Sequence, residues 1–331
     1  MKSWTQFLFA ILVIGFTIST FANNLEHHSG YSRIIVFGDS LSDVGTYAVF
    51  AGLRGGGKFT TNPGKIWVEI VAEKLGLPMM PNRQEGFGVP LREIGGFNYA
   101  QGGSRIVIPH NQTAQEVETL TARPLTEQLG LFLSKYSRFN EDDLVLIQGG
   151  ANDILTQLRE IGQNGKTPAE AIQNSVQAGL DLATIMANMK DHGAEKIFVI
   201  NLPAIEKTPR VLTLDADAQR LAASMVAAFN QTLAIKSFEL GIRVIDFYQF
   251  DINFNDQATG LGFSDITHPA CKADRYSFGS ALFCSLSSLV EPGADLKFKY
   301  ADEMHPTTGF SKQAGEFIYN QITSLRGSIQ F

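Results

Sequence analysis

Short apolar runs alternate with longer amphipathic stretches through most of this chain. The apolar runs are rich in Ile, Val, Leu and Phe and predict strands at Arg33 to Phe37, Phe97 to Ala100, Leu144 to Gln148, Lys196 to Asn201 and Ile242 to Phe247. The amphipathic stretches predict helices at Lys65 to Leu75, Pro124 to Tyr136, Pro168 to Met189, Ala216 to Phe238 and Gly309 to Leu325. Such alternation predicts an α/β fold with a mostly parallel central sheet that helices cover on both faces.

The size and charge of the chain limit its partners. With 331 residues the chain is long enough to bury a sizeable core, and we expect one domain over residues 23–331. It has 33 acidic and 27 basic residues, a formal net charge of -6 and no long run of Lys and Arg, so a nucleic-acid partner is not expected. The sequence contains no C-x-x-C, H-E-x-x-H or EF-hand pattern, and therefore implies no metal.

The N-terminus has the pattern of a secretory signal peptide over residues 1–22. Lys2 precedes an apolar stretch from Phe7 to Ile18, and small residues at Thr20 and Ala22 predict cleavage after Ala22. An uncleaved membrane anchor is the alternative, but the apolar stretch is shorter than the roughly 18 to 20 residues that a membrane-spanning helix needs. No cysteine stands directly after the cleavage site, which argues against a lipoprotein. We therefore expect a secreted or periplasmic protein.

Export would place the two cysteines of the chain, Cys271 and Cys284, in an oxidising compartment. A disulfide between them is the prediction, and two separately buried thiols are the alternative. Both cysteines lie in a turn-rich stretch from Asp251 to Asp295, which is predicted to be a loop insertion. This insertion would either shape the substrate entrance or form a stapled surface loop without contact to ligand.

Ser40 is the candidate nucleophile. It stands in Gly38-Asp39-Ser40-Leu41, directly after the apolar run that ends at Phe37, and so at the carboxyl end of the first predicted strand. Open α/β sheets carry their chemistry at this edge. Ser42 and Asp43 can cap a following helix, whose N-terminus would favour an oxyanion near the Ser40 hydroxyl. Serine after Gly-Asp is also common in ordinary turns, so the tetrapeptide alone is only suggestive.

Two glycine-containing segments are candidates for the oxyanion hole. Asn152 follows Gly149 and Gly150, where a flexible backbone could bring its side-chain amide close to a developing oxyanion. Gly103, in the pair Gly102-Gly103, could expose its backbone N–H to the same oxygen. The alternative for Asn152 is a helix cap or a turn residue, and for the glycine pair it is a plain turn.

The general base has to come from six histidines. Two of them have an aspartate three residues upstream and a proline directly after, in Asp265-Ile266-Thr267-His268-Pro269 and Asp302-Glu303-Met304-His305-Pro306. This spacing lets the carboxylate reach Nδ1 of the ring, so that Nε2 can accept the serine proton. We prefer Asp302 with His305, because this pair precedes the last predicted helix, whereas His268 lies in the cysteine-bearing insertion.

The four fragments, in this order, resemble blocks I, II, III and V of the GDSL family, the SGNH hydrolases. The resemblance is closest to the larger secreted bacterial members, since it includes Phe37 to Asp43 and Asp302 to Thr307. It implies a three-layer α/β/α sandwich of flavodoxin-like type. It also implies Ser40 as nucleophile, Asp302 and His305 as its partners, no cofactor, and an oxyanion hole made by Ser40, Gly103 and Asn152. Gly103 fits the block II glycine because it stands five residues after Asn98.

Family members include esterases, lipases, lysophospholipases, acyltransferases and carbohydrate acetylesterases. The resemblance therefore implies ester hydrolysis on a small-molecule or lipid substrate, with acyl transfer to another alcohol or sugar deacetylation as alternatives. A lipid substrate would imply transient contact with a membrane surface.

Two other classes of function fit less well. Gly52 to Lys58 imitates a phosphate-binding loop, but Phe59 replaces the Ser or Thr that would bind magnesium. A non-catalytic binding module would be favoured only by loss of a key residue, and all are present.

Overall fold

The computed structural model describes residues 30–107, 110–111, 121–273 and 279–324. The predicted signal peptide and its cleavage site lie outside the described residues. The central sheet consists of four parallel strands in the order β1-β6-β7-β8. Their bounds are Arg33–Phe37 for β1, Asp143–Gln148 for β6, Lys196–Ile200 for β7 and Arg243–Ile245 for β8. The α/β class and the parallel sheet are therefore confirmed.

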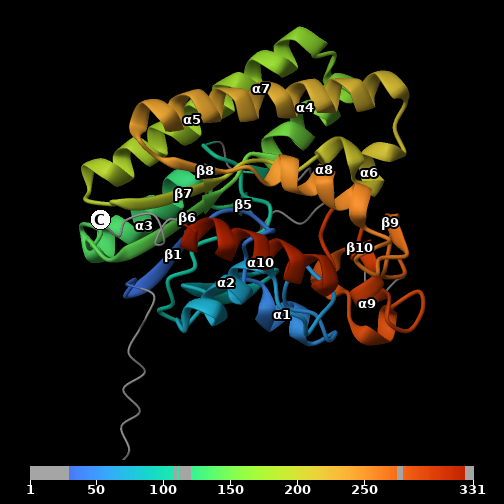
Figure 1. Ribbon diagram of the computed structural model, residues 1–331, viewed down its shortest axis with the longest axis horizontal. Helices are drawn as coiled ribbons and strands as arrows, with labels where there is room; N and C mark the ends of the chain where they lie inside the picture. Colours follow the sequence, from blue (N-terminus) through green and yellow to red (C-terminus); the bar gives the residue numbers. More distant parts are fainter. Residues whose placement is uncertain (1–29, 108–109, 112–120, 274–278, 325–331) are drawn as a thin grey trace, which may run out of the picture.

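Side chains of the sheet alternate between two apolar cores. Ile35, Phe37 and Val145 belong to one core, and their neighbours Ile34 and Leu144 belong to the other. Both sets are buried, as expected for a parallel sheet covered on both faces. The first core packs against α3 (Leu125–Tyr136), α4 (Ala151–Asn164), α5 (Pro168–Asp191) and α7 (Ala216–Leu240). The second packs against α2 (Trp67–Leu75), α8 (Phe247–Gln257) and α10 (Thr308–Thr323). Figure 1 shows the resulting three layers, with α5 and α7 on one side and α2 and α10 on the other.

The remaining elements are short and lie in the connections. The helical ones are α1 (Ala48–Gly52), α6 (Pro209–Leu212), α9 (Ala294–Lys297) and the 3₁₀ turns η1 (Ile205–Lys207), η2 (Ala281–Phe283) and η3 (Leu286–Ser288). The extended ones are β2 (Arg83–Gly86), β3 (Val89–Glu93), β4 (His110–Asn111), β5 (Thr121–Ala122), β9 (Asp265–Pro269) and β10 (Phe298–Tyr300). Among the helices within the described ranges, none is long and apolar enough to cross a bilayer.

The predicted strand at Phe97 to Ala100 is wrong. The segment makes isolated parallel bridges rather than a ladder, from Asn98 to Val36 of β1 and from Asn98 to Pro81. Asn98 explains why it does not continue as a strand, because its buried side chain bonds backbone groups instead of leaving them for a ladder. Its Nδ2 donates to Ser42 O at 2.8 Å and its Oδ1 accepts from Ala100 N at 3.1 Å. Such local bonds of Asn compete with regular pairing.

The prediction of a loop over Asp251 to Asp295 is also wrong in part. The helix α8 extends to Gln257, and β9, β10 and α9 form further regular structure in or beside the expected loop. Phe247, Phe250 and Phe254 recur at helical spacing and pack in the second core. Interleaved Asn and Asp residues obscured this pattern in the sequence. The predicted strand end at Phe247 is likewise a helix start, capped by Asp246, which accepts a hydrogen bond from Gln249 N at 3.1 Å.

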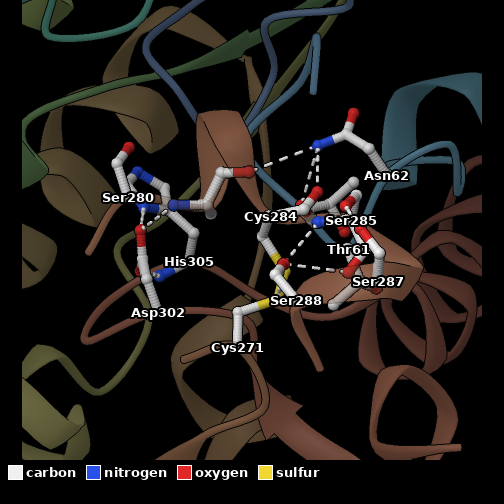
Figure 2. The surroundings of a disulfide bond; sticks show 12 residues. Thr61, Asn62, Cys271, Ser280, Cys284, Ser285, Ser287, Ser288, Asp302 and His305 are labelled. Carbon is white, nitrogen blue, oxygen red and sulfur yellow. Dashed lines mark hydrogen bonds and ion pairs between the residues drawn. A yellow bond between two sulfur atoms is a disulfide. The ribbon is translucent and has the colours of Figure 1, made fainter. Parts of the chain in front are cut away.

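In the structure a disulfide joins Cys271 and Cys284, whose Cα atoms are 5.9 Å apart (Figure 2). The bridge closes a short loop, since the cysteines are 13 residues apart. In the chain-entropy account, a loop of this size contributes about 3 kcal/mol, mainly by restricting the unfolded state. We expect Cys271→Ser to lower the midpoint of thermal unfolding, which calorimetry would measure. An unchanged midpoint would show that the loop stays ordered without the bond.

Candidate active site

Ser40 stands three residues after Phe37, the last residue of β1, and its side chain is almost fully buried. Gly38, two residues before Ser40, has to be a glycine, because a Cβ there would lie 2.8 Å from the carbonyl oxygen of Gln148. Gln128 of α3 fixes this glycine further. Its side-chain amide donates to Gly38 O at 2.8 Å and accepts from Gly38 N at 2.9 Å. Sequence reasoning missed Gln128, since no local signal connects it to a turn 90 residues away.

His305 and Asp302 come from the turn between β10 and α10. The ring atom Nε2 of His305 lies 2.8 Å from Ser40 Oγ, and Nδ1 lies 2.7 Å from Oδ2 of Asp302. Oδ1 of the same carboxylate accepts the backbone N–H groups of Met304 and His305 at 2.8 and 2.7 Å. Thr307 then caps α10 by accepting a hydrogen bond from Phe310 N. The turn thus fixes the carboxylate, and the carboxylate orients the imidazole toward Ser40.

Burial and charge act in opposite directions on this pair. Burial lowers the pKa of His305, but the charge and hydrogen bond of Asp302, with the charge of Asp39, raise it above its ordinary value of 6.5. Burial raises the pKa of Asp302, yet the charge and hydrogen bonds of His305, with the N–H of Ala281, lower it below its ordinary value. The pair therefore consists of an ionised carboxylate and an imidazole that readily accepts a proton.

The second Asp-x-x-His-Pro segment, which is the strand β9, makes the same carboxylate–imidazole contact at another place in the fold. Asp265 Oδ1 accepts the N–H groups of Thr267 and His268, each at 2.8 Å, and Oδ2 lies 2.8 Å from Nδ1 of His268. The His268 side chain, however, is 75% exposed, whereas that of His305 is 10% exposed. The local sequence therefore specifies the carboxylate–imidazole contact in both segments. The tertiary fold brings only His305 to Ser40.

Asn152 lies in the first turn of α4, a helix that the sequence reasoning did not predict. Its Nδ2 donates to Ser104 O at 2.9 Å, and since a side-chain amide carries two protons, one remains for another acceptor. The preceding Gly150 has a φ of 109°, and a Cβ there would lie 2.6 Å from the ring of Phe229. Glycine therefore permits both the backbone conformation and the packing that present Asn152 at the site.

Gly103 lies in the adjoining turn with a φ of 85°, a conformation that favours glycine. The turn is held on both flanks, by Gly102 N donating to Asp43 Oδ2 at 2.9 Å and by the bond from Asn152 to Ser104. Within the described part of the chain, the N–H groups of Ser40 and Gly103 have no hydrogen-bond acceptor. Ser40 and Asn152 line the same cavity, and the bond from Asn152 to Ser104 O places the turn of Gly103 next to Asn152.

Two buried carboxylates beside these turns were not singled out from the sequence. Burial raises the pKa of Asp39 to about 6, although hydrogen bonds from Leu41 N and Gln148 oppose the shift. Burial also raises the pKa of Asp153, against the charge and hydrogen bond of Arg105. Asp153 accepts from Arg105 Nε at 2.9 Å and from Ile106 N at 3.1 Å. In the sequence, only its position next to Asn152 could have singled out Asp153. Its hydrogen bonds connect α4 to the segment that follows Gly103.

Comparison with known proteins decides the family. A profile of the family described as GDSL-like Lipase/Acylhydrolase matches residues 34–318. The chain belongs to this family. It is similar to the phosphatidylcholine-sterol acyltransferase of Aeromonas hydrophila, with 27% identity over 292 residues, 83% of this chain and 74% of that protein. It is also similar to Lipase 1 of Photorhabdus luminescens, with 23% identity over 62% of this chain and 27% of that protein. This GDSL protein is therefore an ester-bond hydrolase.

Solved structures align over most of the chain. A member of the lipolytic G-D-S-L family from Veillonella parvula matches 89% of this chain and 98% of its own, with 16% identity and a TM-score of 0.42. Phospholipase A1 from Streptomyces albidoflavus matches 87% of this chain and 97% of its own, with 12% identity and a TM-score of 0.43.

A cavity of about 910 Å³, counted with its part open to solvent, adjoins Ser40 and His305 in this GDSL hydrolase. Most of its lining is apolar and comes from α4, from the segment after β7 and from α10. Representative residues are Leu155, Ile200, Ile205, Met304 and Phe310. Two charged residues also line it, Asp251 and Lys299, which are both buried and form an ion pair at 2.7 Å. The cavity therefore has polar side chains, Ser40 and His305, at one place in its wall and space for an apolar group beside them.

Proposed function

We propose that this GDSL hydrolase cleaves carboxylic esters through an acyl-enzyme on Ser40, with His305 as general base and Asp302 as its partner. The observation that carries the proposal is the continuous hydrogen-bonded series from Asp302 Oδ2 through the His305 ring to Ser40 Oγ, with distances of 2.7 and 2.8 Å. A serine hydroxyl is a weak nucleophile unless a base removes its proton as it attacks. All three residues are buried, so the pair can act without competition from bulk water.

In the first half of the reaction, Ser40 Oγ attacks the ester carbonyl carbon and its proton moves to Nε2 of His305. The tetrahedral intermediate then collapses, and the imidazolium returns this proton to the departing alkoxide, which leaves as an alcohol. In the second half, water gives a proton to His305 as it attacks the acyl carbonyl carbon. The tetrahedral intermediate then collapses and releases a carboxylic acid, while the departing Ser40 Oγ takes the proton back from His305. Asp302 stays ionised throughout and stabilises the imidazolium.

The N–H groups of Ser40 and Gly103 would stabilise the negative charge on the carbonyl oxygen by hydrogen bonds. The second N–H of Asn152 Nδ2, which does not bond Ser104, would do the same. Such donors act mainly in the transition state, so their loss lowers kcat more than it changes KM. Asn152→Ala is expected to lower kcat by about 10² to 10³ with little change in KM. Steady-state kinetics on a soluble ester would measure both. A loss below about threefold would assign Asn152 to holding the Ser104 turn only.

The pH dependence follows from the base. His305 must be neutral to accept the proton, and its raised pKa keeps it protonated to a higher pH than a free imidazole. The sequence alone predicts a midpoint of about 6 to 7. Because the pKa of His305 is raised, kcat/KM should increase with pH and reach half its plateau value above pH 6.5. Initial rates from about pH 5 to about pH 9 would measure this. A flat profile up to about pH 8 would contradict the assignment of the base.

We propose an ester with an apolar acyl group, such as a lipid or lysophospholipid, as the substrate. The apolar lining of the adjoining cavity supports this, because it can take an acyl chain out of water. The names of the similar proteins support a lipid class as well. The name of the Aeromonas protein also favours acyl transfer, in which an acceptor alcohol replaces water in the second half-reaction. An acetylated sugar is the remaining alternative, and it would leave most of the cavity unused.

A substrate panel tests this proposal. It contains short and long p-nitrophenyl esters, a phospholipid, a lysophospholipid and an acetylated sugar, each with and without an acceptor alcohol. We expect long-chain and lipid esters to have the highest kcat/KM, with free fatty acid or a new ester as the product. Highest activity on the acetylated sugar would contradict the lipid assignment. Cleavage of none of these esters would overturn the proposed activity as a whole.

We further propose that the protein is exported, with cleavage after Ala22 and one domain over residues 23–331. The apolar N-terminal stretch and the disulfide between Cys271 and Cys284 support this, because stable disulfides belong to oxidising compartments. The N-terminus of the protein purified from its native compartment should be Asn23. A protein that retains Met1 would contradict cleavage after Ala22, and one that carries two free thiols would remove the support that the disulfide gives to export.

A further inference from the structure

The carboxylate of Asp302 has a partner outside its own turn. Oδ2, the oxygen that faces His305, also accepts the backbone N–H of Ala281 at 2.6 Å. Ala281 is fully buried and begins η2, in the segment that ends at Cys284. This segment lies more than fifteen positions before Asp302 and is attached to Cys271 by the disulfide. The hydrogen bond from Ala281 N to Asp302 therefore depends on the position of the segment from Ala281 to Cys284.

Asn62 holds this segment from the other side. Its buried Nδ2 lies 2.9 Å from Cys284 O and 3.2 Å from Ala281 O, and its backbone N–H donates to Cys284 O at 2.9 Å. The same Nδ2 also contacts Lys58 O and Thr60 O, and Oδ1 accepts from Lys58 N at 2.9 Å. Figure 2 shows the segment with Ser280 and Cys284 between Asp302 on one side and Asn62 on the other.

The residues next to Asn62 reach the His305 side of the pair. Thr60 Oγ1 donates to Pro306 O at 3.0 Å, and Thr61 Oγ1 accepts from Thr308 N at 2.9 Å. The ring of Phe59 lies against the ring of His305, with centroids 4.9 Å apart. The stretch from Phe59 to Asn62 therefore contacts both the backbone after His305 and the segment that donates to Asp302.

We propose that Asn62 is a positioning residue for Asp302 and His305, and that it acts by fixing the Ala281 N–H against Oδ2 of Asp302. The inference rests on the proposed function, because it assigns Asn62 a part in the same reaction. Asn62 does not touch the reacting atoms. Its buried amide instead joins the loop before α2 to the disulfide-bearing segment, and this segment supplies the donor.

The donor has a chemical consequence beyond geometry. The N–H of Ala281 lowers the pKa of Asp302, together with the larger effect of His305. If this donor withdraws, more of the carboxylate charge acts on the imidazole, and the imidazolium holds its proton more tightly. The pKa of His305 then rises, and the acid limb of the activity profile moves to higher pH. A residue needed only for stability would leave this midpoint unchanged.

The test is the substitution Asn62→Ala, measured well below its unfolding midpoint with near-ultraviolet circular dichroism as the check on folding. We expect kcat to fall by about 10- to 100-fold with little change in KM, because a small displacement of a catalytic group has effects of this size. The midpoint of the acid limb should move to higher pH. Asn62→Ser keeps a hydroxyl that can donate to one carbonyl, so it should lie between Asn62→Ala and wild type, and it replaces Asn62→Ala if that variant does not fold.

Ser288→Ala is the matched control. Ser288 belongs to the same disulfide-bearing region, where its Oγ donates to Ser285 O and contacts Cys271 Sγ, but it has no contact with Ala281 or Asp302. This variant should keep the kcat and the pH midpoint of wild type. If folded Asn62→Ala and Asn62→Ser behave in the same way, the positioning role is wrong. Parallel measurement of Ser40→Ala separates the two proposals, since its full activity would overturn the proposed function instead.

Discussion

Replacing Ser40 by alanine is expected to lower kcat/KM for ester cleavage by about 10⁴ to 10⁶-fold while the protein stays folded. The substitution removes the attacking oxygen and its hydrogen bond to His305 Nε2. It removes a single buried hydroxyl oxygen and leaves the apolar cores intact, so the free energy of unfolding should change by only about 1 kcal/mol. Steady-state rates on a short p-nitrophenyl ester, together with thermal unfolding, would measure both effects.

Ser42→Ala is a suitable control for Ser40→Ala. Ser42 is a buried neighbour whose Oγ lies 3.3 Å from Gln148 Oε1, and it has no contact with His305. Its substitution should cost far less activity than that of Ser40. Equal losses in the two variants would indicate that the segment tolerates no change, and would remove the support for a nucleophilic role of Ser40.

Replacing His305 by alanine is expected to lower kcat by several orders of magnitude, about 10⁴ or more, whereas His268→Ala should leave activity within about twofold of wild type. The two histidines make the same contact with an aspartate three residues upstream. They differ in place, since only His305 contacts Ser40. The pair of variants therefore separates local geometry from position in the fold.

Each histidine variant serves as the control for the other, because both lose one imidazole and one contact to a carboxylate. His268 is exposed, so its loss should also change stability little. Rates on the same short ester at a pH above the midpoint would measure the comparison. If His268→Ala were the inactive variant, the assignment of the base to His305 would be refuted.

The four strands of the central sheet and most of the long helices could be predicted because their signals are local, whereas α4 (Ala151–Asn164) was missed. The apolar run at Arg33 to Phe37 is the strand β1 without any change of bounds, and Thr167 before Pro168 starts α5 as a capping residue does. The segments that failed carry conflicting signals. In α8, Asn and Asp separate the phenylalanines, and near Asn98 the side chain takes up backbone groups that a strand would need.

The site could be predicted where its residues lie in short motifs, and not where the contacts are long-range. Each motif stands next to an element that the sequence predicts. Ser40 and Asn152 follow predicted strands, and the turn from Asp302 to His305 precedes the last predicted helix. Nothing local marks Gln128 as the partner of Gly38, or Asn62 as the residue that holds Cys284 and Ala281. Such contacts join segments 90 or more residues apart, and they follow only from packing of the sheet and its helices.

The acyl-enzyme on Ser40 is the central claim, and trapping it is the most direct measurement. The protein would be treated with a fluorophosphonate, or quenched in acid during turnover of a slow ester, and then digested and analysed by mass spectrometry. We predict one added group per chain, on the peptide that contains Ser40, and none in Ser40→Ala. An adduct on another residue, or ester cleavage with no adduct under either condition, would contradict the account.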